Sequence, residues 1–462
     1  RGADDRRRDF GEIYARFSAE RAAAQAARCS QCGVPFCQDH CPLGNNIPDW
    51  LRLVAEGRER EAYELSAATN NMPEVCGRIC PQDRLCEGSC VIEQSGHGTV
   101  TIGAVESYLT DLAWENGWVR PITPRAERGE SVGIVGAGPA GLAAAEQLRA
   151  EGFRVTVYDR YDRAGGLLIY GIPNFKLDKS IVEQRVARLE AAGVDFVLGY
   201  DLGADETLGD LKRRHDAVLL AVGVYKARDL ACPGAGEARV VPALEYLTAS
   251  NRNGLGLSAP HFENGTLNAS GKRVVVIGGG DTAMDCVRTA VRQGARSVTC
   301  LYRRDRENMP GSQREVGHAE EEGVSFDWLS APRAITSTGV LAARMRLGAP
   351  DASGRRAPEP IEGGDFTVEA DLVIKALGFE PEDADRLFGA VAPRLTARGT
   401  LAVNPQTLET TADGVYAAGD IVRGASLVVW AIRDGRVAAA AIAERLKARA
   451  AASAASSRVA AE

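Results

Sequence analysis

Residues 131–159 read SVGIVGAGPAGLAAAEQLRAEGFRVTVYD, and this stretch decides the fold. A short apolar strand, 131–135, runs into a Gly-x-Gly-x-x-Gly turn, and an Ala-rich helix follows. The first glycine permits a tight turn, the second lets backbone approach a pyrophosphate, and the third allows close helix packing. A second strand, 154–159, ends in an acidic residue that can accept hydrogen bonds from ribose hydroxyls. The pattern predicts a dinucleotide-binding βαβ unit with the candidate residues Gly136, Gly138, Pro139, Ala140, Gly141 and Asp159.

The same pattern returns later in the chain. Strand 273–277 precedes the turn Gly-Gly-Gly-Asp-Thr-Ala at 278–283, in which alanine takes the place of the last glycine, and strand 297–302 follows. This second strand is followed by two arginines, whose guanidinium groups match the charge and geometry of a ribose 2′-phosphate. A carboxylate there would repel that phosphate. We therefore expect NADPH rather than NADH at the residues Gly278, Gly280, Asp281, Thr282, Ala283, Arg303 and Arg304.

A distant Gly-Asp pair favours FAD as the ligand of the first turn. The segment 414–420 reads GVYAAGD. It resembles the strand of two-dinucleotide flavoenzymes whose final aspartate contacts the ribityl and pyrophosphate region of the flavin. Taken alone, Asp420 could instead be a turn residue that caps the next helix. Together with the first turn, Gly419 and Asp420 indicate a flavin site.

Eight of the eleven cysteines are crowded into two short runs. Eight thiolates could hold two 4Fe-4S clusters, and the Cys-Pro steps are like those of bacterial ferredoxins. Zinc is the alternative, but structural zinc sites usually separate two Cys pairs by a longer loop and often include histidine. The remaining three cysteines form no Cys-x-x-Cys pair, so we expect no redox dithiol beside the flavin. The candidate ligands are Cys29, Cys32, Cys37, Cys41, Cys76, Cys80, Cys86 and Cys90.

Length and charge narrow the class of protein. At 462 residues the chain has room for about three domains. Its formal charge of −7 argues against a nucleic-acid binder, which would carry clustered Lys and Arg. No window approaches the roughly 18 apolar residues of a membrane span, and the first residues carry no apolar signal segment. We expect a cytoplasmic protein that binds neither nucleic acid nor membrane.

The pattern of elements predicts how the domains are arranged. Helices are predicted at 12–28, 47–56 and 103–116 with the cysteine runs in loops between them, and short strands ending in glycine at 217–223, 372–378 and 414–419. We predict an α/β protein with an N-terminal all-α iron–sulfur domain and two Rossmann-like domains, the NADPH-binding one inserted in the FAD-binding one. The predicted boundaries are 1–125 for the iron–sulfur domain, 126–240 and 371–448 for the FAD domain, 241–370 for the NADPH domain and 449–462 for a flexible tail.

From about Ala26 onward the chain resembles the small (β) subunit of NADPH-dependent glutamate synthase. The stretches that carry the resemblance are CGRICPQDRLCEG at 76–88, GGLLIYGIPNFKL at 165–177 and RRDRENMPGS at 303–312. The resemblance adds Gly166 and Leu167 to the flavin site. Dihydropyrimidine dehydrogenase and NAD(P)H:ferredoxin oxidoreductases contain a similar FAD, NADPH and iron–sulfur module.

The resemblance also implies a scheme of cluster ligands. It places Cys29, Cys32 and Cys37 on one cluster, which a polar side chain of an Ile-Gly-x-x-Gln motif completes, and it places the second set on the other cluster. The motif here reads IGAVE at 102–106, so Glu106 replaces the glutamine. Glu106 could be an oxygen ligand or a helix-surface carboxylate, and Cys76 could be the missing thiolate. The second set is Cys41, Cys80, Cys86 and Cys90.

The function implied by the resemblance is electron input. NADPH would be oxidised by hydride transfer to FAD, a reaction that asks for orientation rather than for a proton-transfer residue, so no catalytic side chain is predicted. Electrons would leave through the 4Fe-4S clusters to the FMN of a large glutamate synthase subunit, which makes L-glutamate from L-glutamine and 2-oxoglutarate in amino-acid biosynthesis. The length leaves no room for an FMN barrel or an amidotransferase domain, so we expect a hetero-oligomer.

Two other functions stay open from the sequence. The chain could be the NADP-binding flavoprotein subunit of a ferredoxin- or sulfide-linked oxidoreductase. It could also be a non-catalytic scaffold with a degenerate flavoprotein fold, although the intact glycine turns, Asp159, Asp420 and the arginine pair argue against decay.

Overall fold

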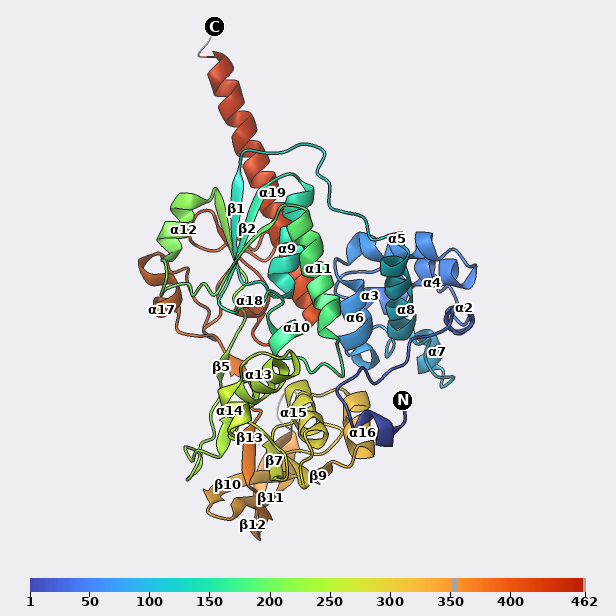
Figure 1. Ribbon diagram of the computed structural model, residues 1–462, viewed down its shortest axis with the longest axis vertical. Helices are drawn as coiled ribbons and strands as arrows, with labels where there is room; N and C mark the ends of the chain where they lie inside the picture. Colours follow the sequence, from blue (N-terminus) through green and yellow to red (C-terminus); the bar gives the residue numbers. More distant parts are fainter. Residues whose placement is uncertain (351–355, 460–462) are drawn as a thin grey trace. The chain divides into compact units, whose positions relative to one another are not determined.

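The computed structural model describes residues 1–350 and 356–459, and the chain folds into two compact units that share it in alternating pieces (Figure 1). Unit 1 contains Arg1–Ala15, Tyr170–Asp178 and Lys226–Phe379. Unit 2 contains Arg16–Ile169, Lys179–Tyr225 and the chain from Glu380 onward. Among the described residues, no helix combines the length and apolar character needed to cross a membrane.

Unit 2 contains a five-stranded parallel sheet of Rossmann type. Its strand order is β15-β4-β1-β2-β3, with β1 in the centre because it pairs with β2 on one side and β4 on the other. The strands are β1 (Ser131–Val135), β2 (Arg154–Asp159), β3 (Asp195–Leu198), β4 (Ala217–Leu220) and β15 (Val415–Ala417). The associated helices are α9 (Pro139–Ala150), α10 (Leu167–Tyr170), α11 (Lys179–Ala191), α12 (Leu208–Arg214), α17 (Ala384–Phe388), η2 (Gly389–Val391), α18 (Asp420–Arg423) and α19 (Val428–Val459).

A helical region precedes this sheet in unit 2. Its core gathers apolar side chains of α2, α4, α5 and α8 around Trp50, which is fully buried and donates its indole N–H to Asn45 Oδ1 at 2.7 Å. The cysteines lie at the edge of this core. The elements are α2 (Ala19–Ala26), α3 (Phe36–Asp39), α4 (Ile47–Ala55), α5 (Glu59–Thr69), α6 (Pro73–Ile79), η1 (Gln82–Arg84), α7 (Val91–Gln94) and α8 (Ile102–Glu115).

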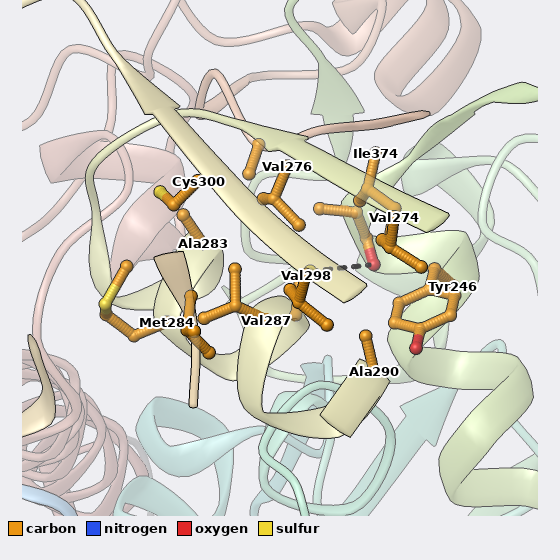
Figure 2. Packing of buried hydrophobic residues seen from close by; sticks show 14 of the residues in the cluster. Tyr246, Val274, Val276, Ala283, Met284, Val287, Ala290, Val298, Cys300 and Ile374 are labelled. Carbon is orange, nitrogen blue, oxygen red and sulfur yellow. Dashed lines mark hydrogen bonds between the residues drawn. The ribbon is translucent and has the colours of Figure 1, made fainter. Parts of the chain in front are cut away.

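Unit 1 contains a second five-stranded parallel sheet, in the order β6-β13-β7-β8-β9, and an antiparallel sheet, β10-β11-β12. Figure 2 shows the core beside β7 and β8, where Ala283, Met284 and Val287 pack among the strand side chains. The strands are β5 (Lys226–Ala227), β6 (Val240–Pro242), β7 (Arg273–Ile277), β8 (Ser297–Tyr302), β9 (Ser325–Trp328), β10 (Ser330–Thr336), β11 (Gly339–Pro350), β12 (Arg356–Glu369), β13 (Leu372–Lys375) and β14 (Phe379–Glu380). The helices are α1 (Ala3–Arg6), α13 (Ala243–Gly254), α14 (Pro260–Glu263), α15 (Asp281–Arg292) and α16 (Gln313–Glu321).

The fold class predicted from the sequence is confirmed, and both βαβ units have the predicted strands and helices. Two local predictions were wrong. The helix predicted over 12–28 is α2 alone, because the Ser18 side chain accepts from the Arg21 N–H and caps it there. Cys76 lies in α6 and Cys37 in α3, rather than in loops. In the segment predicted as a flexible tail, α19 continues as far as Val459 and 460–462 lie outside the described residues, so its flexibility stays a prediction.

The first fifteen residues belong to unit 1, although the sequence placed them in the helical domain. The buried Arg6 side chain donates to Glu322 Oε1 at 2.9 Å, and the Phe10 ring lies 6.3 Å from that of Phe175. Charge pairing of this kind is invisible to periodicity because the partners lie about 300 residues apart in the sequence.

Candidate functional site

The first glycine turn connects β1 to α9 and leaves its backbone accessible. Gly136 has φ of +109°, and a Cβ there would lie 2.2 Å from the Ala221 carbonyl oxygen. A Cβ on Gly141 would lie 1.9 Å from the Gly136 carbonyl oxygen. Gly138, the N-cap of α9, is different, because a Cβ there would meet no heavy atom within 4 Å. The first and third glycines therefore serve the fold, and the second leaves space at a helix N-terminus where a pyrophosphate fits.

Asp159 ends β2 beside this turn and is held by the backbone. Its carboxylate accepts the Ala137 N–H at 2.6 Å and the Tyr161 N–H at 2.8 Å, one on each oxygen. Burial raises the pKa of Asp159, and these two N–H bonds act in the opposite direction. Each carboxylate oxygen has a second lone pair, so the residue keeps the capacity to accept ribose hydroxyls.

Gly419 and Asp420 lie at the end of β15, close to the start of α9. A Cβ on Gly419 would lie 3.2 Å from the Ala140 Cβ, and Gly419 has φ of +76°. Asp420 opens α18. Burial raises its pKa to about 7, while a backbone N–H bond from Ser426 opposes the shift. Gly419, which is distant from the first turn in the sequence, therefore lies beside it in the fold, and Asp420 follows directly.

The resemblance had already added Gly166 and Leu167 to the flavin site, whereas Arg160 and Tyr225, which lie near them, were not evident from the sequence. A Cβ on Gly166 would lie 2.9 Å from the Gly138 Cα and 3.9 Å from the Tyr225 hydroxyl, so Gly166 adjoins the glycine turn. Leu167 follows it as the first residue of α10. The Arg160 guanidinium lies 4.2 Å from the centre of the Tyr225 ring. A lone arginine and tyrosine have no motif, so only the fold could reveal them.

The second glycine turn, between β7 and α15, repeats the first in detail. Gly278 has φ of +147°, and a Cβ there would lie 2.2 Å from the Ala376 carbonyl oxygen. Gly280 is the N-cap of α15, and a Cβ there would meet no heavy atom within 4 Å. Thr282 and Ala283 follow in the first turn of α15. The Asp281 carboxylate accepts the Ser312 N–H at 2.9 Å, so it braces the loop that carries the arginine pair.

The arginine pair follows β8 directly. Arg303 is exposed and Arg304 is half-buried, and neither forms an ion pair within the part of the chain that the structure describes. The Arg304 Nε is buried and has no hydrogen-bond partner among those residues. Arg306, by contrast, donates to Glu320 Oε1 at 2.9 Å. Two guanidinium groups with unused donors next to a dinucleotide turn fit a 2′-phosphate.

The eight clustered thiols form two neighbouring groups. In the outer group, the pKa of Cys29 is raised by burial and by the thiols of Cys32 and Cys90, and burial, with Cys29 and Cys90 nearby, raises that of Cys37 to about 12. The inner group lines one cavity. A thiol of each group, Cys37 and Cys86, interact electrostatically, so the groups are adjacent. The outer group is Cys29, Cys32, Cys37 and Cys90, and the inner group is Cys41, Cys76, Cys80 and Cys86.

The inner cavity also holds a carboxyl group. Glu106 lines it and accepts the Ser66 hydroxyl at 3.4 Å, and burial raises its pKa to about 8. The Cys76 thiol lies 3.8 Å from Asn70 Oδ1. Both candidates for the uncertain ligand position therefore face the same cavity. Glu106 is a buried residue and not the helix-surface carboxylate that the sequence allowed.

This grouping of neighbouring side chains differs from the ligand scheme implied by the resemblance. Cys90 lies with Cys29, Cys32 and Cys37, and Glu106 lies with the inner thiols, so the two have exchanged places. The reason is the fold. Cys90 precedes α7, in a chain segment that returns to the first cysteine run, whereas Glu106 lies in α8, which packs against α6.

The donor set fits an iron–sulfur cluster. Backbone N–H groups point at the thiols, from Gln31 to Cys29, from Gln38 to Cys37 and from Asn45 to Cys41. Such bonds stabilise thiolate ligands. No three His, Cys, Asp or Glu side chains among the described residues converge as ligands of one metal ion do. The inner thiols line a cavity, which is the arrangement that a multi-iron cluster needs.

A buried charge network lies one helical turn beyond the second glycine turn. Lys176 Nζ lies 3.0 Å from Asp285 Oδ1 on α15 and 3.4 Å from Glu315 Oε2 on α16. Burial raises the pKa of Asp285 to about 6, although Lys176 pulls it down. Lys176 belongs to the segment 165–177 that carried the resemblance, but the sequence assigned it no role. The network ties α15 and α16 together behind the turn.

Two protein families match the chain. Residues 6–118 match the family described as dihydropyrimidine dehydrogenase domain II, 4Fe-4S cluster, and residues 130–435 match the pyridine nucleotide-disulphide oxidoreductase family. The chain is 65% identical over 454 residues to the glutamate synthase [NADPH] small chain of Azospirillum brasilense, covering 97% of this chain and 94% of that protein. It is 46% identical to the protein of the same name from Escherichia coli K12, covering 94% of this chain and 93% of that one. These matches confirm the family resemblance.

Solved structures agree at the level of the fold. FprA of Mycobacterium tuberculosis in complex with NADPH matches with a TM-score of 0.60 and 21% identity, over 71% of this chain and 86% of that chain. At this identity the likeness concerns the fold alone.

Proposed function

The chain belongs to the family of glutamate synthase [NADPH] small chains, and from that premise we propose that it is the electron-input subunit of a glutamate synthase. It is an NADPH-dependent flavin and iron–sulfur oxidoreductase. The observation that carries the proposal lies in unit 2. Val429 of α19 lines the inner thiol cavity, and α19 packs against α9, the helix that begins at the flavin turn. The same helix, α19, therefore contacts both the inner thiol cavity and the helix that begins at the first glycine turn.

The binding residues follow from the two turns. Gly138 and the N-terminus of α9 would hold the FAD pyrophosphate, with Asp159 on a ribose and Asp420 towards the ribityl chain. Gly280 and the N-terminus of α15 would hold the NADPH pyrophosphate, with Arg303 and Arg304 on the 2′-phosphate. When bound, these groups supply hydride acceptance at the flavin and single-electron transfer at the clusters. The side chains orient the cofactors and need not move a proton.

We propose two 4Fe-4S clusters, one in each thiol group. Cys29, Cys32, Cys37 and Cys90 would hold the outer one. Cys41, Cys80 and Cys86 would hold the inner one, and Cys76 or Glu106 would complete it. The variants Cys76→Ser and Glu106→Ala separate these alternatives. Only the substitution that removes the true ligand should lower the iron content and change the EPR signal of one cluster. If both variants keep their iron content and their EPR signals, neither residue is a ligand.

The proposed partner is a large glutamate synthase subunit that carries FMN and forms L-glutamate from L-glutamine and 2-oxoglutarate. Three exposed apolar side chains support an exit at the outer thiols, since each lies within two residues of one of them: Val34, Phe36 and Val91. All eleven cysteines are free thiols, which supports a reducing compartment, and we place the protein in the cytoplasm.

One experiment tests this function. The purified chain should oxidise NADPH with a dye acceptor but form no glutamate until the large subunit is added. Glutamate formation by the chain alone would contradict the proposal that the large subunit forms the product. Faster electron transfer to ferredoxin or polysulfide than to the large subunit would identify a different oxidoreductase.

A further inference from the structure

Gln31 has an unusual backbone between two of the outer thiols. Its φ is +50°, and among the described residues only Leu329 and Leu408 share a positive φ without being glycine. The left-handed region is unfavourable for a residue with a Cβ, and such strain persists where the surroundings hold it. Gln31 lies between Cys29 and Cys32, so the strained residue is part of the ligand loop itself.

Both N–H groups of Gln31 are directed at one sulfur. The side-chain Nε2 donates to Cys29 Sγ at 3.4 Å, and the backbone N–H of Gln31 also bonds to that thiol. The same Nε2 donates to the Pro48 carbonyl oxygen at 2.7 Å. A carbonyl oxygen only accepts, so this contact fixes which end of the amide faces the thiol.

Pro48 gives this contact a rigid support. It is buried in the first turn of α4, next to the core around Trp50. The amide of Gln31 is therefore held between a fixed carbonyl and the sulfur, and the positive φ is what brings both of its N–H groups to the same side of the loop.

Two kinds of neighbour act on Cys29 in opposite directions. The thiols of Cys32 and Cys90 disfavour a negative charge on its sulfur, whereas the two N–H groups of Gln31 favour one. Hydrogen bonds to ligand sulfurs stabilise the reduced, more negative form of an iron–sulfur cluster and raise its reduction potential.

We propose that Gln31 is a positioning residue of the outer thiol group, whose amide N–H bond to Cys29 raises the reduction potential of the cluster held there. This inference rests on one part of the proposed function, namely that the outer thiol group holds a cluster. It adds which side chain sets the potential at which that cluster takes up an electron.

The test is an EPR-monitored redox titration of the purified chain with its cofactors, alongside iron analysis. Gln31→Met keeps the length and removes the amide donor. Gln31→Gly also removes it and relieves the positive φ, so it guards against misfolding. Gln38→Met is the matched control, because Gln38 follows Cys37 in α3 and its side chain donates to Asn46 Oδ1 at 3.1 Å and not to a thiol.

We expect both Gln31 variants to keep their iron and to shift one cluster to a lower midpoint potential, while the second cluster and Gln38→Met stay at wild-type values. Unchanged potentials in both Gln31 variants would overturn the inference. An equal shift in Gln38→Met, or loss of the cluster from both Gln31 variants, would overturn it as well. A wild-type chain whose iron accounts for only an inner cluster would instead refute the proposed function.

Discussion

Gly435 of α19 lies directly against Ala140 of α9, so closely that a Cβ on Gly435 would come within 2.1 Å of the Ala140 carbonyl oxygen. The two helices run side by side in unit 2 (Figure 1). Ala140 is the second residue of α9, two positions after the open Gly138. The C-terminal helix therefore sets the position of the first glycine turn from behind, and no motif in the sequence marks Gly435.

Gly435→Ala should release FAD and destabilise unit 2. The methyl group must displace backbone, and overpacking of this kind costs about 1–3 kcal/mol. We expect less flavin absorbance per chain and a lower thermal unfolding midpoint. Gly317→Ala on α16 is the control, since a Cβ there meets nothing within 4 Å. A Gly435→Ala protein with full flavin content and wild-type stability would show that the helices have room to separate.

Substitutions at Gly138 and Gly280 should each affect the binding of a different cofactor. Gly280→Ala places a methyl group where we expect the NADPH pyrophosphate, without a clash inside the protein. We predict retained FAD and a KM for NADPH raised about tenfold or more, because the methyl group would occupy space that the pyrophosphate needs and so weaken its binding. Gly138→Ala should do the reverse and lower FAD content. Equal loss of FAD in both variants would mean that the turns are not assigned to separate ligands.

Replacing both Arg303 and Arg304 by serine should weaken discrimination between NADPH and NADH. A hydrogen bond to a charged group contributes about 1.5–3 kcal/mol, so kcat/KM for NADPH should fall by about tenfold to a hundredfold. The value for NADH should change little. Arg306→Ser is the control, since Arg306 is already paired with Glu320. Steady-state kinetics with both nucleotides check this, and an unchanged ratio would exclude the arginine pair.

The sequence predicted what is local and periodic, and it failed where the determinants come together from far apart. The two βαβ units were predictable because strand, glycine turn and helix follow one another within about thirty residues. The grouping of thiols was not, because Cys90 and Glu106 reach their groups through the packing of α6, α7 and α8. Tyr225, Gln31 and Gly435 carry no periodic or motif signal.

Lys176→Met should destabilise unit 1 in a pH-dependent way. The folded pKa of Asp285, about 6, lies above its unfolded value, so its contribution to stability is complete at low pH and is lost as the pH rises through that value. Lys176 limits this loss. Without it the folded pKa rises further, and the stability gap between wild type and variant should widen as the pH rises above about 6.

Thermal unfolding midpoints across this pH range measure the gap. The double variant Lys176→Met with Asp285→Asn has no buried carboxylate to ionise at that position, so its gap should stay flat. Lys447→Met removes an exposed partner of Glu151 and serves as a surface control. A gap for Lys176→Met that does not depend on pH would refute the role of Asp285.

The alternating division of the chain has a consequence for its synthesis on the ribosome. Each parallel sheet needs a strand from the last quarter of the chain: β13 stands between β6 and β7 in one, and β15 completes the other beside β4. Neither sheet can be completed until these late strands have emerged from the ribosome. The apolar side chains of both sheets therefore stay exposed while most of the chain is synthesised. The nascent protein is therefore expected to depend on protection from aggregation until translation is nearly finished.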